Sequence, residues 1–271
     1  MNPSLITAFA QFAPTTDAAV NRAQIDALVA EASGSGARLL ILPEESMLVA
    51  GEIPAAEREA AVAAAWPEFL AHLSGLAARD DIWVIAGGYE PSGSERPHNT
   101  LVVMNRRGDL VDTYRKLHLY DAFAYRESDY VTAGVELPPL VLVEGVAVGL
   151  VNCYDLRFPE LSRDLIARGA DVLSVSAAWV AGDRKLEHWR TLLTARAIEN
   201  TCWVVASGTT ASDCIGTSMV IDPLGVEVAQ LGPSGSAVGI VEISLERTAE
   251  VREALPALSN RRFVAHLTHQ E

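Results

Sequence analysis

Cys153 lies at a junction where a thiol can become a nucleophile. An apolar run over 146–151 predicts a strand, and a helix is expected over 158–168, with a proline in its first turn. Unpaired N–H groups at a helix start would lower the thiol pKa and favour the thiolate. The N–H of Tyr154 would stabilise an oxyanion there. Cysteine is also a common inert core residue, so this segment alone leaves both interpretations open.

Two more reactive side chains directly follow expected strands. Glu44 comes after the apolar run 38–42 and a proline, and desolvation there would raise its pKa toward that of a useful general base. Lys116 follows the expected strand 110–115 and would offer a fixed positive charge to a developing oxyanion. Open α/β folds build their sites at strand ends. Taken singly, each residue also fits a surface position, a loop glutamate or a snorkelling lysine.

The elements that position these residues alternate between strand and helix. This alternation predicts an α/β fold with mixed sheets covered by helices, and the two similar halves suit two sheets packed face to face. No linker divides the sequence, so we expect a single domain over 1–271. The expected strands are 5–12, 38–42, 82–87, 101–105, 110–115, 140–143, 146–151, 171–176, 203–207, 218–221, 226–230 and 237–243, and the expected helices are 17–33, 54–79 (bent at Trp66-Pro67), 158–168 and 186–200.

Composition excludes several classes of protein. The net charge of −14 repels phosphate backbones and anionic lipid, so neither nucleic acid nor a membrane is an expected partner. No apolar run reaches membrane-spanning length, and no basic region precedes the first apolar stretch. The three cysteines lack a zinc-ligand spacing and suggest no disulfide framework, which favours a reducing, cytoplasmic location. No metal-ligand cluster such as H-E-x-x-H is present.

Taken together, the three reactive segments and several others resemble the nitrilase, or carbon–nitrogen hydrolase, family. The resemblance covers nearly the whole chain. It rests on Pro43-Glu44, Arg115-Lys116-Leu117-His118-Leu119, Arg126-Glu127-Ser128-Asp129, Cys153-Tyr154-Asp155-Leu156-Arg157-Phe158-Pro159-Glu160, His188-Trp189, Ala195-Arg196-Ala197-Ile198-Glu199-Asn200 and Ser218-Met219-Val220-Ile221-Asp222-Pro223-Leu224-Gly225.

The resemblance implies a four-layer α-β-β-α sandwich that forms a homodimer or a higher homo-oligomer. It implies that Glu44 is the general base, Lys116 the oxyanion-stabilising cation and Cys153 the nucleophile. Glu127 would orient these groups. The implied reaction hydrolyses the carbon–nitrogen bond of a small-molecule amide through a thioester. Neither a metal nor an organic cofactor is implied.

The pair Tyr154-Asp155 after the cysteine resembles the amidase branch that acts on ω-amides of 2-oxo acids and on deaminated glutathione. Nitrilases usually carry Trp-Glu at this point, and carbamoylases Asn-Asp. An amide is therefore favoured over a nitrile or an N-carbamoyl amino acid, which stay as alternatives. Asn152 departs from the apolar residue usual before the cysteine, and the short loop 116–127 leaves the shape of the pocket mouth open.

Tyr154, Arg157 and Trp179 are the expected substrate contacts. A carboxylated substrate would need a cation, which Arg157 or Arg126 would supply. Both arginines could instead pair with nearby acidic residues, and Trp179 could be a packing residue.

A different class of function also stays open, because a fold does not prove activity and the chain could be a non-catalytic binding or scaffold protein. Against a papain-like protease, the papain-type cysteine signature is absent, and His118 and His188 are expected to be structural. Cys202 and Cys214 are expected in the core, and the last 20 or so residues as a tail that packs on a neighbour.

Overall fold

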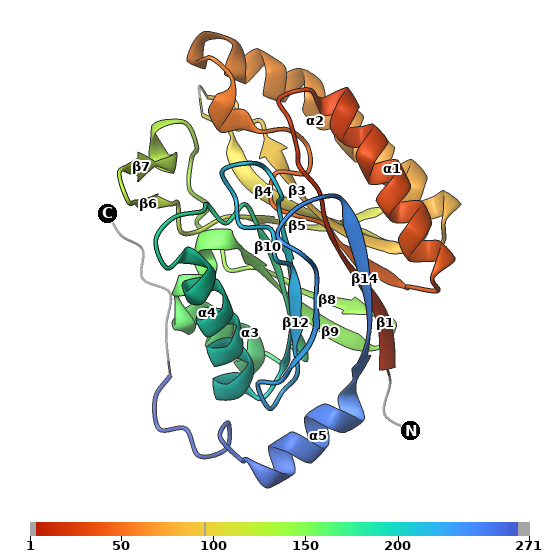
Figure 1. Ribbon diagram of the computed structural model, residues 1–271, viewed down its shortest axis with the longest axis vertical. Coiled ribbons are helices and arrows are strands. Elements are labelled where there is room, and N and C mark those ends of the chain that lie inside the picture. The colour runs from red at the N-terminus through yellow and green to blue at the C-terminus, as the bar shows by residue number, and fades with distance from the viewer. Residues whose placement is uncertain (1–3, 95, 265–271) are drawn as a thin grey trace.

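A computed structural model describes residues 4–94 and 96–264 of the chain (Figure 1). Two six-stranded sheets form its centre. The first sheet has the order β14-β1-β2-β3-β4-β5, with β1, β2 and β3 parallel and the outer pairs antiparallel. Its strands are β1 (Ser4–Gln11), β2 (Leu39–Ile41), β3 (Trp83–Glu90), β4 (His98–Met104), β5 (Leu110–Arg115) and β14 (Ala237–Ser244).

The second sheet repeats this plan with the later strands. Its order is β13-β12-β11-β10-β9-β8, and β9, β10 and β11 are the parallel strands. The strands are β8 (Leu140–Val143), β9 (Val146–Asn152), β10 (Val172–Ala177), β11 (Trp203–Gly208), β12 (Met219–Ile221) and β13 (Glu227–Gln230). A two-stranded hairpin of β6 (Asp121–Ala122) and β7 (Tyr125–Arg126) stands apart from both sheets.

Helices cover the outer face of each sheet. In Figure 1, α1 (Ala18–Gly34) and α2 (Ala55–Arg79) lie over the first sheet, and α3 (Pro159–Ala167) and α4 (Lys185–Asn200) lie over the second. The side chain of Asp17 caps α1 by accepting from the N–H groups of Ala19 and Val20. α2 runs through Pro67 as one helix. The layers are therefore helix, sheet, sheet and helix, which confirms the expected fold class.

Alternation along the strands divides the apolar core into three layers. In β1, Ala8 and Ala10 face the helices α1 and α2, whereas Leu5 and Phe9 face the other sheet. In β10, Leu173 likewise packs toward the second pair of helices. Because successive strand residues point to opposite faces, each strand contributes to two layers at once.

Some elements differ from the sequence-based expectation. The helix α5 (Leu245–Ala254) was not expected, and Ser244 caps it by accepting from the N–H of Arg247. The hairpin β6–β7 was expected as loop. Both are short and mostly exposed, so they carry little hydrophobic periodicity. Of the expected tail, residues 265–271 lie outside the described residues.

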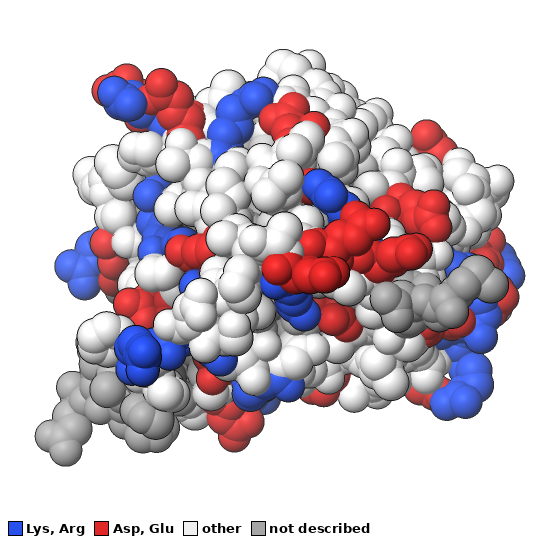
Figure 2. All heavy atoms as spheres, turned by 90° about the horizontal axis from the view of Figure 1, so that it is seen from below, with Lys and Arg blue, Asp and Glu red and all other residues white. Residues whose placement is uncertain are grey.

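Charged residues are spread over the surface. Figure 2 shows one face on which acidic side chains form a band, with Lys and Arg scattered around it. No helix among the described residues is long and apolar enough to cross a membrane.

Candidate active site

Four side chains predicted from the sequence meet at one edge of the two sheets. Glu44 follows β2, Lys116 follows β5 and Cys153 follows β9, so each lies just beyond the end of a strand. Glu127 begins a short 3-10 turn after the β6–β7 hairpin. All four are buried. The first sheet therefore supplies the carboxyl group and the amine, and the second sheet supplies the thiol.

The amino group of Lys116 lies between two carboxyl groups. Its Nζ donates to Glu44 Oε1 at 2.7 Å and to Glu127 Oε2 at 2.8 Å. An ammonium has three donors, so one stays available for a further acceptor. Glu127 also accepts from the N–H of Tyr120 at 2.6 Å, which fixes its position.

Asn99, in β4, joins the two carboxyl groups to the second sheet. Its Nδ2 donates to Glu44 Oε1 at 2.8 Å and to Glu127 Oε1 at 2.9 Å, while its Oδ1 accepts from Asn152 at 2.9 Å. The other oxygen of Glu44 accepts from the N–H of Ala178 at 2.8 Å. Both oxygens of Glu44 are thus held in place, and Asn152 has a polar role in this network that explains its departure from an apolar residue.

Gly87 allows β3 to approach the segment that carries Glu44. A Cβ at Gly87 would lie 1.9 Å from the backbone oxygen of Glu44, far inside contact distance. Any larger residue would therefore push Glu44 away from Lys116.

The electrostatics of Glu44 and Lys116 are those of a buried ion pair. Burial alone would raise the pKa of Glu44, but the positive charge of Lys116 and its hydrogen bond outweigh this and hold the pKa below the ordinary value. Burial likewise opposes the charge on Lys116, yet Glu127 and Glu44 hold its pKa well above the usual range. The expected rise in the pKa of Glu44 is wrong, because desolvation was considered there without the cation.

The pKa of Cys153 also shifts in the direction opposite to the one expected. Burial raises its pKa well above the ordinary value, and the negative charge of Glu44 raises it further against the effect of Lys116. The expected lowering is wrong because burial and the carboxylate of Glu44 outweigh the charge of Lys116. The helix start that was expected to lower the pKa is only a five-residue 3-10 turn (Cys153–Arg157), and α3 begins at Pro159. Cys153 therefore rests as a protonated thiol within hydrogen-bonding reach of a carboxylate.

The backbone of Cys153 is strained. Its φ of 48° lies in the left-handed region, which residues with a side chain rarely adopt. Strained positions of this kind cluster at functional sites, because the surrounding structure must hold them. Here the strain belongs to the sharp turn between β9 and the 3-10 segment.

A third carboxyl group borders the centre. Glu45 accepts a hydrogen bond from the Tyr89 hydroxyl at 2.8 Å. Burial, with the negative charge of Glu44 in addition, raises the pKa of Glu45 to about 8.

A small pocket opens onto Cys153. Tyr154, Arg157 and Trp179, which were predicted to contact the substrate, line it, and so do Tyr120 and Lys185. Trp179 also packs against Trp189 with ring centroids 5.2 Å apart, so it serves the core as well as the pocket.

Arg126 does not line this pocket. Its side chain is 70% exposed and pairs with Asp129 at 3.4 Å. Of the two candidate cations, only Arg157 reaches the pocket, because Arg126 ends a surface hairpin.

Sequence analysis missed Asn99 and Lys185. Asn99 carries no motif of its own, and its role arises because β4 lies beside β3 in the sheet. Lys185 begins a helix whose start is marked by no capping side chain. His118, which was predicted to be structural, has its Nδ1 2.7 Å from Asp155 and its ring stacked on Phe158.

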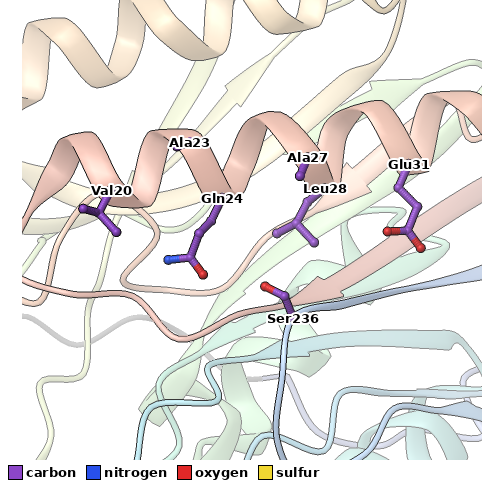
Figure 3. Close-up of a pocket in the computed structure, with 7 residues that line it drawn as sticks. All are labelled: Val20, Ala23, Gln24, Ala27, Leu28, Glu31 and Ser236. Carbon is purple, nitrogen blue, oxygen red and sulfur yellow. The ribbon is translucent and has the colours of Figure 1, made fainter.

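Other parts of the described chain hold fewer groups that could react with a substrate or bind a metal ion. No group of His, Cys, Asp and Glu suited to a metal ion occurs in residues 4–94 and 96–264. A second hollow lies along α1 between Val20 and Glu31, on the side that faces Ser236, and Figure 3 shows the side chains that line it. It contains no thiol, amine or imidazole, and Glu31 is its only carboxylate.

Known proteins are similar to this chain in sequence and in fold. The model of the carbon–nitrogen hydrolase family matches residues 6–253. The deaminated glutathione amidase of Escherichia coli O157:H7 is 40% identical over 259 residues, which is 96% of this chain and 98% of that relative.

Two solved structures are similar as well. The NitFhit protein of C. elegans has a TM-score of 0.89 at 32% identity, over 96% of this chain and 66% of that longer chain. A structure of an amidase from Nesterenkonia sp. AN1, with an acetamide moiety covalently added at its active-site cysteine, has a TM-score of 0.79 at 26% identity, over 97% of this chain and 96% of that one. The resemblance found from sequence motifs is confirmed, and the chain belongs to the carbon–nitrogen hydrolase family.

Proposed function

We propose that this protein hydrolyses the carbon–nitrogen bond of a small amide, giving a carboxylic acid and ammonia, with Glu44, Lys116 and Cys153 as catalytic residues. The observation that carries the proposal is the Lys116 ammonium bound to Glu44 and Glu127 beside a buried thiol. A cysteine nucleophile needs a base to take its proton and a cation to meet the negative oxygen. Membership of the family and the relatives named as amidases support the same reaction.

In the first half of the reaction, Glu44 accepts the proton of Cys153 as the sulfur attacks the amide carbon. The free N–H of Lys116 and the N–H of Tyr154, in the first turn of the 3-10 segment, stabilise the negative oxygen. Glu44 then gives its proton to the departing nitrogen. The carbon–nitrogen bond breaks, ammonia leaves, and the acyl group stays on sulfur as a thioester.

In the second half, a water molecule replaces ammonia. Glu44 takes a proton from this water as its oxygen attacks the thioester, and Lys116 again stabilises the negative oxygen. The carbon–sulfur bond breaks, the acid is released, and the proton on Glu44 returns to the sulfur. Glu127 positions Lys116 throughout, and the resting state of thiol and carboxylate is restored.

For the substrate, we propose an ω-amide of a 2-oxo acid or a related compound such as deaminated glutathione. The relative in Escherichia coli, similar over nearly its whole length, is named a deaminated glutathione amidase. Tyr154, Arg157 and Trp179 line the pocket beside Cys153 and would contact the substrate. A nitrile, an N-carbamoyl amino acid or a binding function without catalysis are the outcomes against which the proposal is tested.

We further propose that the chain acts in the cytoplasm as one domain over 1–271 and as a homodimer or higher homo-oligomer, without metal, cofactor or nucleic acid. Three free cysteines suit a reducing compartment. Exposed apolar side chains of Ile198, Leu224 and Val226 gather near Gly225, and such groups mark protein interfaces. Sedimentation analysis tests the oligomeric state, and a monomer at micromolar concentration would reject it.

The experiment for the reaction measures the nitrogen product that the wild type and Cys153→Ala release from a panel of compounds, which is cysteinylglycine for deaminated glutathione and ammonia for the others. The panel contains ω-amides of 2-oxo dicarboxylic acids, deaminated glutathione, aliphatic amides, a nitrile and an N-carbamoyl amino acid. We expect release from the carboxylated amides, and a loss of at least about ten-thousand-fold in kcat in the variant, because its nucleophile is gone.

Two results would reject the proposal. A folded Cys153→Ala protein that keeps its turnover would remove the thiol from the mechanism. No release from any compound by the wild type, together with a Cys153 that does not react with a thiol reagent, would favour a binding protein on this fold.

A further inference from the structure

Lys185 is a buried cation without a carboxylate partner in the described part of the chain. Only 5% of its surface is exposed, yet its Nζ donates to the neutral hydroxyl of Tyr120 at 2.6 Å. The rings of Phe123 and Tyr120 lie 4.2 and 4.8 Å from Nζ. Aromatic faces attract a cation, but they do not neutralise it. A buried ammonium in this state is costly, so a ligand that carries the missing charge would stabilise it.

Arg157 presents an unused edge in the same pocket. Its guanidinium carbon lies 4.7 Å from the centroid of the Trp179 ring, and its Nε and Nη2 are buried with no hydrogen-bond partner among the described residues. These two nitrogens lie on one side of the planar guanidinium. Their spacing matches the two oxygens of one carboxylate, which accept such a pair of parallel hydrogen bonds. The ion pair with Asp155, Glu160 or Glu127 that sequence analysis left open is not formed by Arg157.

The local backbone places both cations near the nucleophile. Arg157 ends the 3-10 segment that Cys153 begins. Lys185 begins α4 directly after Arg184, whose φ of 57° is left-handed, and its carbonyl accepts from Trp179 Nε1 at 3.0 Å. Burial and the nearby charge of Arg157 lower the pKa of Lys185, as like charges at close range must.

We propose that Lys185, held by Tyr120, is a further specificity residue, which binds and neutralises the carboxylate of a carboxylated amide beside Arg157. This inference rests on the proposed amidase function and adds Lys185, with Tyr120, as a residue that determines specificity. Arg157 binds both oxygens of the carboxylate through its free edge. Lys185, with donors left beyond its bond to Tyr120, binds one of the same oxygens and neutralises the charge.

The test compares two amides of equal chain length, one charged and one neutral. Succinamic acid carries a carboxylate opposite its amide, and butyramide ends in a methyl group. We expect Lys185→Met to lower the ratio of kcat/KM for succinamic acid to that for butyramide by about tenfold or more, mainly through KM, because a charge-assisted hydrogen bond is lost. Lys185→Arg should keep most of the ratio.

Arg184→Met is the matched control. Its side chain is one position away, but it is 68% exposed and pairs with Glu187 at 2.7 Å. Removing this charge should leave the ratio within about twofold, because exposed pairs are screened by water. An equal fall in both variants would mean that general charge, and not a subsite, determines the preference, and would overturn the inference.

Further outcomes separate the inference from the proposed reaction. A wild type that prefers butyramide, or a Lys185→Met protein with an unchanged ratio, overturns the subsite and leaves the amidase function intact. If no amide is hydrolysed, the amidase function fails, and calorimetry with succinate decides the subsite. Binding that Lys185→Met weakens supports it, and no binding to the wild type overturns it.

Discussion

Two buried lysines, Lys116 and Lys185, lie near Cys153 in very different surroundings. Lys116 is 2% exposed and is bound to two carboxyl groups. Lys185 is 5% exposed and has a hydroxyl and aromatic rings instead. The pKa of Lys116 lies well above its ordinary value after the carboxylates outweigh burial, whereas burial and Arg157 lower the pKa of Lys185.

These surroundings show which part of the site is complete before substrate arrives. Around Lys116, each charge has its partner, and Asn99 and Ala178 hold Glu44. Such a preorganised centre pays no reorganisation cost during the reaction. The positive charge of Lys185 has no acidic partner among the described residues, and an anionic ligand would neutralise it. The region around Lys116 is thus arranged for the reaction before substrate binds, and the region around Lys185 is available to bind the substrate.

The largest expected effect comes from making the same change at both lysines. Lys116→Met leaves Glu44 and Glu127 buried without their cation, so we expect a loss of about 3–5 kcal/mol in the free energy of unfolding, with loss of turnover. Lys185→Met removes a cation that has no carboxylate partner in the part of the chain that the structure describes, so its loss should stay below about 1 kcal/mol. Urea unfolding at pH 7 measures both values.

Equal losses in the free energy of unfolding of the two variants would contradict this difference. That result would mean that Lys185 has an electrostatic partner in the folded protein, and the difference between the two regions would disappear. Circular dichroism of each variant before unfolding checks that both begin from the native fold.

Sequence reasoning captured the framework of this site well. Expected strands such as 110–115 agree with the structure to within a few residues, because strand periodicity and turn residues are local signals. Glu44, Lys116, Glu127 and Cys153 were found because each belongs to a family motif, and the structure brings all four together.

The parts that sequence reasoning missed depend on contacts between distant segments. Asn99 acts through residues of both sheets, and Lys185 is recognisable only once Tyr120 and Arg157 lie beside it. The directions of the pKa shifts at Glu44 and Cys153 were wrong for the same reason. Each is a balance between burial and partners, and a sequence does not give the distances that decide it.

A smaller effect on stability is expected at Glu45, at the border of the catalytic centre. Glu45, with a pKa of about 8 against an ordinary 4.5, keeps its proton in the folded protein between these pH values, whereas the unfolded chain loses it. The free energy of unfolding should therefore fall as pH rises through this window, by at most about 1.4 kcal/mol per pH unit. Above it, a second negative charge stands beside Glu44, near Glu127, Lys116 and Tyr89.

Glu45→Gln should remove that slope. The neutral amide keeps an acceptor for the Tyr89 hydroxyl but cannot ionise, so the variant should be more stable than the wild type at pH 9 and similar at pH 5. Urea unfolding from pH 5 to pH 9 compares the two proteins. If the free energies of unfolding of the two proteins changed in parallel from pH 5 to pH 9, Glu45 would be already ionised, or already solvated, in the native state.

The smallest expected effect lies outside both regions, at Cys202. This thiol is fully buried among apolar residues behind the second sheet, and burial raises its pKa to about 12. Its sulfur lies 3.8 Å from the carbonyl oxygen of Arg196, which would accept from a hydroxyl as well. Cys202→Ser should keep turnover within about twofold and lower the free energy of unfolding by about 1 kcal/mol, because a polar group enters an apolar core. Ammonia release and urea unfolding measure the two quantities. Abolished turnover in a folded Cys202→Ser protein would mean that reactivity is not confined to the thiol held between Glu44 and Lys116.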